Sequence, residues 1–499
     1  MRFMHQIYRF SRMFFLKSIC CVLVVSTYAQ SNQKHFSGDN TDENAFNRIA
    51  KSAQRASRDL DNLPSSFSLK QYAPVPGDQG KHGTCVAWSS GYAARTISYC
   101  IQHQISDPDK IKSVAFSPNY LYYFVKTPGD NNCALGADIE NAMKVLTDTG
   151  DVLLSANISD CMNSPDKGTI NTAKNYSIKA YSSLTNTFGR ITKNEVIAIK
   201  KSIAEKKPVI FSVKYFSSLD SVGNDGIWKI NPGEQSTLNH AICIVGYDDN
   251  KLNGAFEVMN SWDTTWGNKG FFWIGDDQLM QYGSYALEMM DREVYDPNAT
   301  RGFEPPQLKG SLDFVLTNDF GNDVSAMAVS LTKIDAHGIV SIDDSKAAFS
   351  DYRLSENYPG GTKFKIKFTT NAPAFVYIFS IDDNKVVSTL FPYADNVSPA
   401  INSTNATIYL PSESKHYTLN ADASRDRICV LYSKSPVDFN SLKNKITTAP
   451  SNFYETIMSI YRNQLIPLKN INFNGNQISF GSSAGEQELI CFFVDMNHT

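Results

Sequence analysis

The 499-residue sequence predicts a two-lobed α+β domain followed by a mainly β, sandwich-like domain. Two observations support this prediction. Helical spacing of apolar residues prevails in the first part of the chain, whereas short apolar runs bounded by Gly, Asp and Asn prevail from residue 208 onwards. In addition, residues 296–310 contain several prolines in a short polar stretch, which is typical of a linker.

The helical lobe is predicted from periodicity and from helix-start signals. Four segments have helical spacing, namely residues 85–102, 119–125, 138–146 and 195–207. Pro118 stands at the favoured first turn of the second segment, and Gly150 follows the third. Four apolar runs then predict an antiparallel sheet, namely residues 208–215, 241–248, 255–261 and 270–275. We therefore predict one two-lobed domain over residues 63–295.

The region 311–499 is rich in strand signals. Six segments are predicted strands: residues 364–369, 374–380, 385–392, 407–411, 427–433 and 489–494. The turn at residues 382–384, Asp-Asp-Asn, predicts a hairpin of two of them. One amphipathic helix is expected over residues 452–464. A β-sandwich-like domain is the simplest arrangement of these elements.

The N-terminus predicts export. Basic residues precede the apolar run I-C-C-V-L-V-V, and Thr27 and Ala29 are small enough for a cleavage site, so residues 1–29 are predicted to be a secretory signal peptide. A membrane anchor is disfavoured because about a dozen apolar residues cannot span roughly 30 Å of hydrocarbon. The protein would then be periplasmic, cell-surface or extracellular. Residues 30–62 are polar, with helical potential over 44–60, and are expected to be a loosely packed lead-in.

Charge and cysteine content limit the classes of function that the chain can have. A net charge of −3 on 47 basic and 50 acidic residues gives little support for nucleic-acid binding. The chain has nine cysteines, and Cys20 and Cys21 fall in the predicted signal, which leaves an odd number in the mature chain. At least one thiol is therefore free or pairs with another molecule, and Cys85 is the natural candidate.

Three short motifs carry candidate chemistry. Cys85 lies at a loop-to-helix border in D-Q-G-K-H-G-T-C-V-A-W, six residues after Gln79. His240 begins the apolar run of L-N-H-A-I-C-I-V-G-Y-D, where a lone histidine is more often structural. Asn260 follows the next strand in N-S-W-D-T-T-W-G-N-K-G-F-F. Adjacent antiparallel strands would bring Asn260 against His240, with both facing Cys85.

Together these motifs resemble the papain-like cysteine peptidases. The matching features are Gln79 within Q-G-x-x-G-T-C, the N-H-A-I-C-I-V-G-Y-D segment, and the two tryptophans of N-S-W-x-x-x-W-G. The resemblance implies that Cys85 is the nucleophile, His240 the acid/base, Asn260 the residue that orients His240, and Gln79 a donor to the oxyanion. Such chemistry needs no metal and no other cofactor, and its substrates are proteins or peptides.

The chain also departs from that family. The segment H-G-T-C-V lacks the upstream half-cystine and the aromatic residue after the nucleophile, and C-A-L-G-A at residues 133–137 only echoes the family's C-x-G-G. Cys133 and Cys161 are left as either a disulfide or two buried thiols. The stretch before residue 63 is too short for the family's long helical inhibitory prosegment. Residues 311–499 faintly resemble an uncharacterised β domain of exported bacterial proteins and are interpreted as a binding or positioning module.

Three functions therefore remain after the sequence has been considered. The first is an exported cysteine peptidase that acts through a Cys85 thiolate, a His240 imidazolium and an acyl-enzyme thioester. The second is another Cys-His amide hydrolase or transferase, such as a cell-wall peptide amidase or a transglutaminase-like enzyme. The third is a non-catalytic binding protein built on a peptidase scaffold. The combination of Gln79 with the two-tryptophan segment favours the first.

Overall fold

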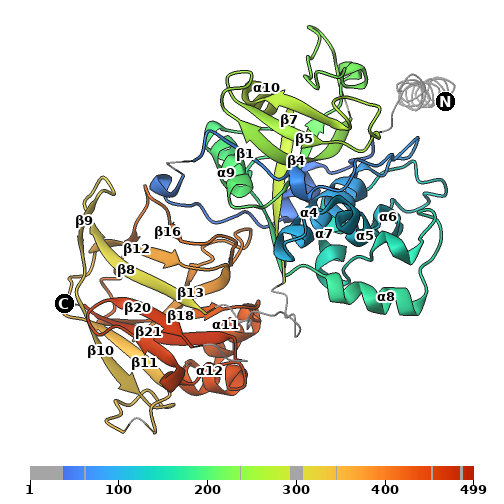
Figure 1. The fold of residues 1–499 in the computed structure, drawn as a ribbon. Coiled ribbons are helices and arrows are strands. Elements are labelled where there is room, and N and C mark those ends of the chain that lie inside the picture. Colours follow the sequence, from blue (N-terminus) through green and yellow to red (C-terminus); the bar gives the residue numbers. More distant parts are fainter. Residues whose placement is uncertain are drawn as a thin grey trace, which may run out of the picture.

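The computed structural model describes residues 37–60, 63–236, 238–292, 307–343, 345–450, 453–483 and 487–498. The predicted signal peptide, residues 1–29, and most of the predicted linker lie outside the described residues. Figure 1 shows two parts, which we call the first domain (residues 63–292) and the second domain (residues 307–498). Within the described ranges no helix has the length and apolar character needed to cross a bilayer.

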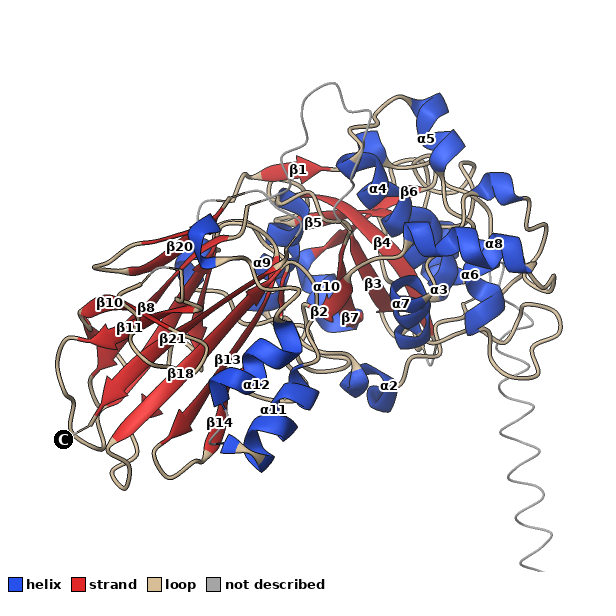
Figure 2. Ribbon diagram, turned by 90° about the horizontal axis from the view of Figure 1, so that it is seen from below, coloured by secondary structure: helices blue, strands red, loops and turns tan. Residues whose placement is uncertain are grey.

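The helices of the first domain lie on both sides of its sheet, with α3 to α8 gathered on one side and α9 and α10 apart from that group (Figures 1 and 2). They are α3 (Cys85–Ala87), the π-helical stretch η3 (Trp88–Arg95), α4 (Thr96–Gln102), α5 (Pro108–Val114), α6 (Pro118–Val125), α7 (Ile139–Asp148), α8 (Lys167–Ala173), α9 (Lys193–Ala204) and α10 (Asp276–Tyr282). Side-chain N-caps explain where several of these helices begin. At the start of α6 the Ser117 side chain accepts from the Tyr120 N–H, and at the start of α7 the Asp138 side chain accepts from the Asn141 N–H. The four predicted helices are confirmed, the first as the continuous run α3–η3–α4.

The sheet of the first domain is antiparallel throughout its described strands. These are β1 (Ser66–Ser68), β2 (Ala180–Ser183), β3 (Val209–Lys214), β4 (Asn239–Asp248), β5 (Ala255–Met259), β6 (Phe271–Gly275) and β7 (Gly283–Met290). Their order is β2-β7-β3-β4-β5-β6, with β1 paired to β4. Strand β4 is buried along nearly its whole length because it is central and covered on both faces. The predicted antiparallel sheet is confirmed.

The second domain is built on two sheets. One has the order β10-β11-β21-β18-β13-β14 and the other β16-β12-β8-β20-β19. The first sheet contains β10 (Val329–Ile334), β11 (Phe349–Leu354), β13 (Ala374–Asp382), β14 (Val387–Phe391), β15 (Ala400–Ile401), β18 (Arg425–Ser433) and β21 (Leu489–Asn497). The second contains β8 (Lys309–Thr317), β9 (Asp323–Ala326), β12 (Lys363–Thr370), β16 (Ala406–Leu410), β17 (Tyr417–Thr418), β19 (Ile471–Phe473) and β20 (Ile478–Ser482).

Successive side chains of β13 point to opposite faces of its sheet, and this alternation shows how the two sheets and the helices pack. Val376 and Ile378 belong to the core between the two sheets, whereas Phe375, Tyr377 and Phe379 point to the opposite face. Two helices cover that opposite face, α11 (Phe439–Thr448) and α12 (Phe453–Tyr461) (Figure 2). The predicted β-rich class and the β13–β14 hairpin are confirmed. Helix α12 matches the helix predicted over residues 452–464, whereas α11 was not predicted.

The N-terminal segment is the main departure from expectation. It is expected to be loosely packed, but several of its side chains are fully buried. Helix α2 (Glu43–Arg48) is followed by extended chain and then by a single 3-10 turn, η1 (Ser57–Asp59). Phe46 and Ile49 belong to the core of the first domain, whereas Ala53 belongs to the core of the second. The segment lies between the two domains (Figure 1). The N-terminal segment is held in place because its apolar side chains are buried in two cores. The polar composition of the segment did not indicate this burial.

Candidate active site

The four residues selected from the sequence come from separate elements of the first domain. Cys85 is the first residue of α3, and Gln79 lies in the loop before it. His240 lies near the start of β4, and Asn260 follows β5 directly. Because β4 and β5 pair antiparallel, the start of one lies beside the end of the other. The thiol of Cys85 is hydrogen-bonded to the backbone of Ala241, the neighbour of His240, so the helix start and β4 meet at this point.

His240 is held on two sides. Its Nε2 lies 2.8 Å from the Oδ1 of Asn260, and because an amide oxygen only accepts, Nε2 carries the proton of this bond. The indole of Trp262 is stacked on the imidazole, with ring centroids 4.9 Å apart. Trp266 packs edge-on against Trp262. His240 is 0 % exposed, so water cannot compete for the bond to Asn260.

Gln79 is fixed by a second residue of the Asn260 loop. Its Oε1 accepts from the Ser261 hydroxyl at 2.6 Å, and its backbone N–H donates to the Ser261 carbonyl at 2.9 Å. Its Nε2 donates to the carbonyl of His82 at 2.7 Å. These contacts settle which end of the amide is oxygen and which is nitrogen. The motifs that hold Gln79 and Asn260 are therefore joined through Ser261.

Residues 37–41, which we call the blocking segment, lie across this site. The Gly38 N–H donates to the Cys85 sulfur at 3.3 Å, and the Ser37 hydroxyl donates to the carbonyl of Asn239. On the other side Ala137 donates its N–H to Gly38 and accepts from Asn40, both at 2.9 Å. The segment thus presents an N–H to the sulfur and occupies the backbone groups on both sides of it.

The side chain of Asp39 fills a polar pocket beside the thiol. One carboxylate oxygen accepts from the hydroxyls of Ser212 and Tyr285, the latter at 2.8 Å, and the other accepts from the Thr41 N–H at 3.1 Å. The carboxyl is fully buried, and this burial raises the pKa of Asp39 in spite of the three hydrogen bonds. Asp39 therefore anchors the blocking segment.

The covered thiol is a weak acid. Burial raises the pKa of Cys85 to about 12, and the nearby carboxylate of Asp39 acts in the same direction. Hydrogen bonds from the backbone of Ala241 and Gly38 oppose this rise without cancelling it. The thiol is therefore protonated at neutral pH in this form.

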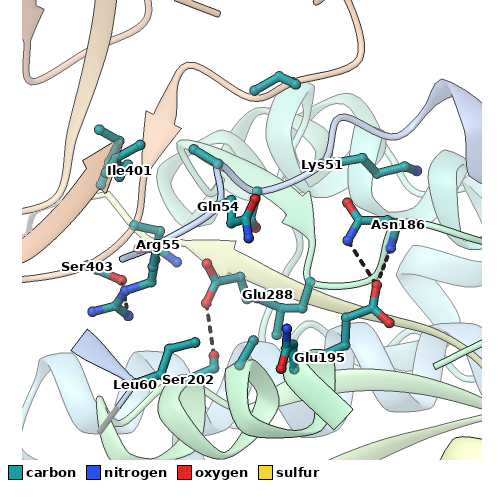
Figure 3. Close-up of a pocket in the computed structure, with 18 of the residues that line it drawn as sticks. Lys51, Gln54, Arg55, Leu60, Asn186, Glu195, Ser202, Glu288, Ile401 and Ser403 are labelled. Atoms are coloured by element: carbon teal, nitrogen blue, oxygen red, sulfur yellow. Dashed lines mark hydrogen bonds between the residues drawn. The ribbon is translucent and has the colours of Figure 1, made fainter. Parts of the chain in front are cut away.

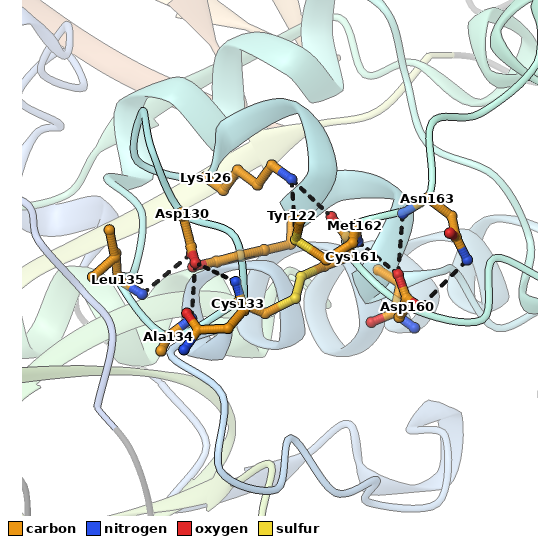
Figure 4. Close-up of a disulfide and its surroundings, with 12 residues drawn as sticks. Tyr122, Lys126, Asp130, Cys133, Ala134, Leu135, Asp160, Cys161, Met162 and Asn163 are labelled. Carbon is orange, nitrogen blue, oxygen red and sulfur yellow. Dashed lines mark hydrogen bonds between the residues drawn. A yellow bond between two sulfur atoms is a disulfide. The ribbon is translucent and has the colours of Figure 1, made fainter.

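The loop that binds the blocking segment from the other side is cross-linked and internally hydrogen-bonded (Figure 4). A disulfide joins Cys133 to Cys161. Asp130 accepts from the N–H groups of Ala134 and Leu135 at 3.1 and 3.2 Å and from the Tyr122 hydroxyl at 2.7 Å. The carbonyl of Cys133 accepts from the Gly83 N–H at 2.7 Å, which ties this loop to the one before Cys85.

Sequence reasoning missed the residues that cover the site. Gly38, Asp39 and Thr41 belong to the polar stretch S-G-D-N-T, which has the composition of an ordinary loop. Ser212 and Tyr285 are buried polar groups within largely apolar strands, and this feature was an available signal for a polar pocket. Ser261 directly follows Asn260, and nothing in the motif indicated its bond to Gln79.

Two parts of the chain match known protein families. Residues 63–290 match the papain family of cysteine proteases. The first domain is thus similar to the papain family of cysteine proteases over nearly all of its length. Residues 357–436 match a domain of unknown function, DUF4384, which lies within the second domain. No activity follows for the second domain from this match.

Individual relatives of the protease domain are distant. The chain is 24% identical to cathepsin L of Sarcophaga peregrina over 224 residues, which cover 44% of this chain and 61% of the relative. It is 29% identical to cathepsin K of Gallus gallus, covering 40% of this chain and 55% of the relative. The chain thus spans less than two thirds of these curated relatives. Among solved structures, xylellain, a cysteine protease from Xylella fastidiosa, is 22% identical with a TM-score of 0.41, covering 52% of this chain and 95% of that one.

A side chain at position 38 is expected to displace the blocking segment. In Gly38→Ala the added Cβ would lie 2.0 Å from the Gly83 carbonyl oxygen, and such overpacking costs about 1–3 kcal/mol. Alkylation of Cys85 by iodoacetamide, followed by mass spectrometry, should therefore become about five- to a hundredfold faster. Gly475→Ala is the matched control, since its Cβ meets nothing within 4 Å. An unchanged rate in Gly38→Ala would mean that residues 37–41 do not limit access to the thiol.

Removal of the charge at position 39 is expected to make Cys85 a stronger acid. Asp39→Asn keeps the shape of the side chain but removes the carboxylate that disfavours the thiolate, so the pKa of Cys85 falls. Burial, the larger cause, keeps it above the ordinary thiol value. The measurement is the pH dependence of Cys85 alkylation, whose midpoint should move to lower pH, whereas the exposed Asp395→Asn should leave it in place. A midpoint that does not move in Asp39→Asn would contradict the assigned charge effect.

Proposed function

We propose that this chain is an exported cysteine peptidase that hydrolyses peptide bonds in protein or peptide substrates, and that its own residues 37–41 cover the active site. One observation carries the proposal. The imidazole of His240 is bonded to Asn260 beneath Trp262, while Ala241, the next residue along β4, is hydrogen-bonded to the Cys85 thiol. These contacts support the pairing of Cys85 with His240 that nucleophilic catalysis by cysteine needs.

The first half of the reaction forms a thioester. Nε2 of His240 is committed to Asn260, so Nδ1 is the ring nitrogen that takes the Cys85 proton. The thiolate sulfur then attacks the carbonyl carbon of the scissile peptide, and the carbonyl oxygen becomes an oxyanion. The Nε2 group of Gln79 and the backbone N–H of Cys85 are the donors proposed to bind it. As the C–N bond breaks, His240 gives its proton to the leaving amine.

Water completes the cycle. His240, neutral again, takes a proton from a water molecule, and the oxygen of that water attacks the thioester carbon. The same two donors bind the second oxyanion. When the carbon–sulfur bond breaks, the acid product leaves and the sulfur returns as a thiolate beside the imidazolium. No metal or other cofactor takes part in these steps.

The covered form cannot carry out this reaction as it stands. The Gly38 N–H is directed at the sulfur, and the burial that this segment causes keeps the thiol neutral. Once residues 37–41 leave, the sulfur gains solvent and loses the nearby carboxylate of Asp39. Both changes lower its pKa and allow the ion pair with His240 to form. The blocking segment is much shorter than a long helical prosegment, yet it occupies backbone groups on both sides of Cys85, where a substrate would have to lie.

Export is supported by two features of the chain. The N-terminal sequence has the basic, apolar and small-residue order of a signal peptide. The Cys133–Cys161 disulfide is of the kind that persists in oxidising compartments outside the cytoplasm. The mature chain would therefore work in a periplasm, on a cell surface or in the medium.

The Cys-His pair is tested by inhibitor labelling in the unblocked Gly38→Ala background. An epoxysuccinyl inhibitor should label Cys85 at neutral pH, and adding His240→Ala should slow the labelling by about a hundredfold or more because the thiolate is no longer stabilised. His337→Ala, which removes an exposed histidine paired with Glu455, serves as control. Labelling that does not depend on His240 would argue against a peptidase and in favour of a binding protein.

The role of Gln79 is tested by steady-state kinetics on a protein substrate in the same background. Gln79→Ala should lower kcat by about a hundredfold and change KM little, because the lost hydrogen bond belongs to the transition state. Gln477→Ala, on an exposed loop of the second domain, should leave both constants unchanged. A rise in KM with unaltered kcat would show that Gln79 binds substrate instead of stabilising the oxyanion.

A further inference from the structure

The stretch that follows the blocking segment is bound by both domains. We call residues 50–59 the bridging segment. On the side of the first domain, Ser183 of β2 donates its N–H to Ala50 and accepts from Ser52, at 2.9 and 2.8 Å. Strand β2 is at the edge of its sheet, so its outer backbone groups are open to such pairing.

The second domain binds the bridging segment in the same manner. The Lys51 N–H donates to Asn396 at 2.7 Å, and the Lys51 carbonyl accepts from Ser398 at 2.8 Å. Further along, the Ala56 N–H donates to the carbonyl of Thr407 in β16, another edge strand, at 2.8 Å. The segment therefore extends sheets of both domains, as an added peptide strand does.

Side chains strengthen the attachment to the second domain. Glu413 accepts from both the backbone N–H and the hydroxyl of Ser57, at 2.8 and 3.1 Å. Arg55 forms an ion pair with Glu205 of the first domain at 2.9 Å and donates to Ser403 of the second at 3.0 Å. Residues from both domains thus contact the side chain of Arg55. Figure 3 shows this side chain beside Ser403.

The junction of the three parts has both polar and apolar lining residues and is incompletely filled. A cavity of about 650 Å³ lies there, lined by the bridging segment, by first-domain residues such as Glu195 and Glu288, and by second-domain residues such as Ile401 (Figure 3). Direct contacts between the domains also occur, for example from the Asn402 side chain to the Met289 carbonyl at 2.9 Å. An incompletely filled junction of this kind can separate more readily than a close-packed core.

We propose that the second domain is a clamp whose binding partner is the bridging segment of its own chain, and that this contact keeps the blocking segment over Cys85. The two segments are joined by the short helix α2, so binding of one holds the other at a high effective concentration. The polar contacts with Thr407 and Glu413 therefore add to the stability of the covered site, although both residues belong to the other domain. The effect on hydrolysis rests on the proposed peptidase function, whereas the clamp itself does not.

The clamp is tested in the full-length chain with two independent variants. Ala56→Pro removes the N–H that donates to Thr407, and Glu413→Ala removes the acceptor for Ser57. Their matched controls are Ala56→Gly, which keeps the N–H, and Glu356→Ala, which truncates an exposed acid of the same domain. The readouts are hydrogen exchange at the amide of Asn40, alkylation of Cys85, and hydrolysis of a protein substrate.

In either clamp variant, exchange at Asn40 and alkylation of Cys85 should rise about tenfold, since one or two hydrogen bonds are lost. In the control variants, the rates of exchange at Asn40 and of Cys85 alkylation should stay near those of the wild-type chain. Faster exchange within residues 50–59 with no change at Asn40 would overturn the proposal. The blocking segment would then stay over Cys85 without the contact between the bridging segment and the second domain. If exchange and alkylation become faster but no substrate is hydrolysed, the clamp proposal stands and the proposed peptidase function is contradicted instead.

Discussion

The hydrogen bond from the Gly38 N–H to the Cys85 sulfur is the contact on which the state of this molecule depends. It forms only because position 38 has no side chain, since a Cβ would collide with the Gly83 carbonyl. With the N–H in place, the backbone groups of Asn239 and Ala137 are occupied by residues 37–41. One short polar segment therefore determines whether the side chains proposed as catalytic are open or covered.

Burial links this contact to the acidity of the thiol. The same atoms that exclude substrate also exclude water, and a thiolate without water or a cation is costly. Asp39 adds a negative charge in the same place while it anchors the segment through Ser212 and Tyr285. Steric closure and loss of nucleophilicity therefore share one cause, so the departure of residues 37–41 would relieve both at once.

Much of the first domain could be predicted because its signals are local. The apolar runs of β4 and β5 fix the antiparallel pairing that brings His240 to Asn260, and the motif around Cys85 marks a helix start. The blocking segment gave no such signal. Gly38 and Asp39 are held by backbone carbonyls, N–H groups and hydroxyls that are far away in the sequence, and composition does not encode such partners. Helix α11 differs from the blocking segment, since Phe439, Leu442 and Ile446 recur at helical spacing and gave a local signal that was overlooked.

The two points of attachment determine where a single backbone cut would open the site. A cut between residues 41 and 50 would separate the blocking segment from the bridging segment, and the few hydrogen bonds of residues 37–41 would then act without the tether. A cut beyond residue 60 would instead leave both segments joined to each other and bound to both domains. The second product would stay closed unless the contacts with the second domain also broke. Hence the position of a cut, and not merely its occurrence, would decide whether Cys85 becomes accessible.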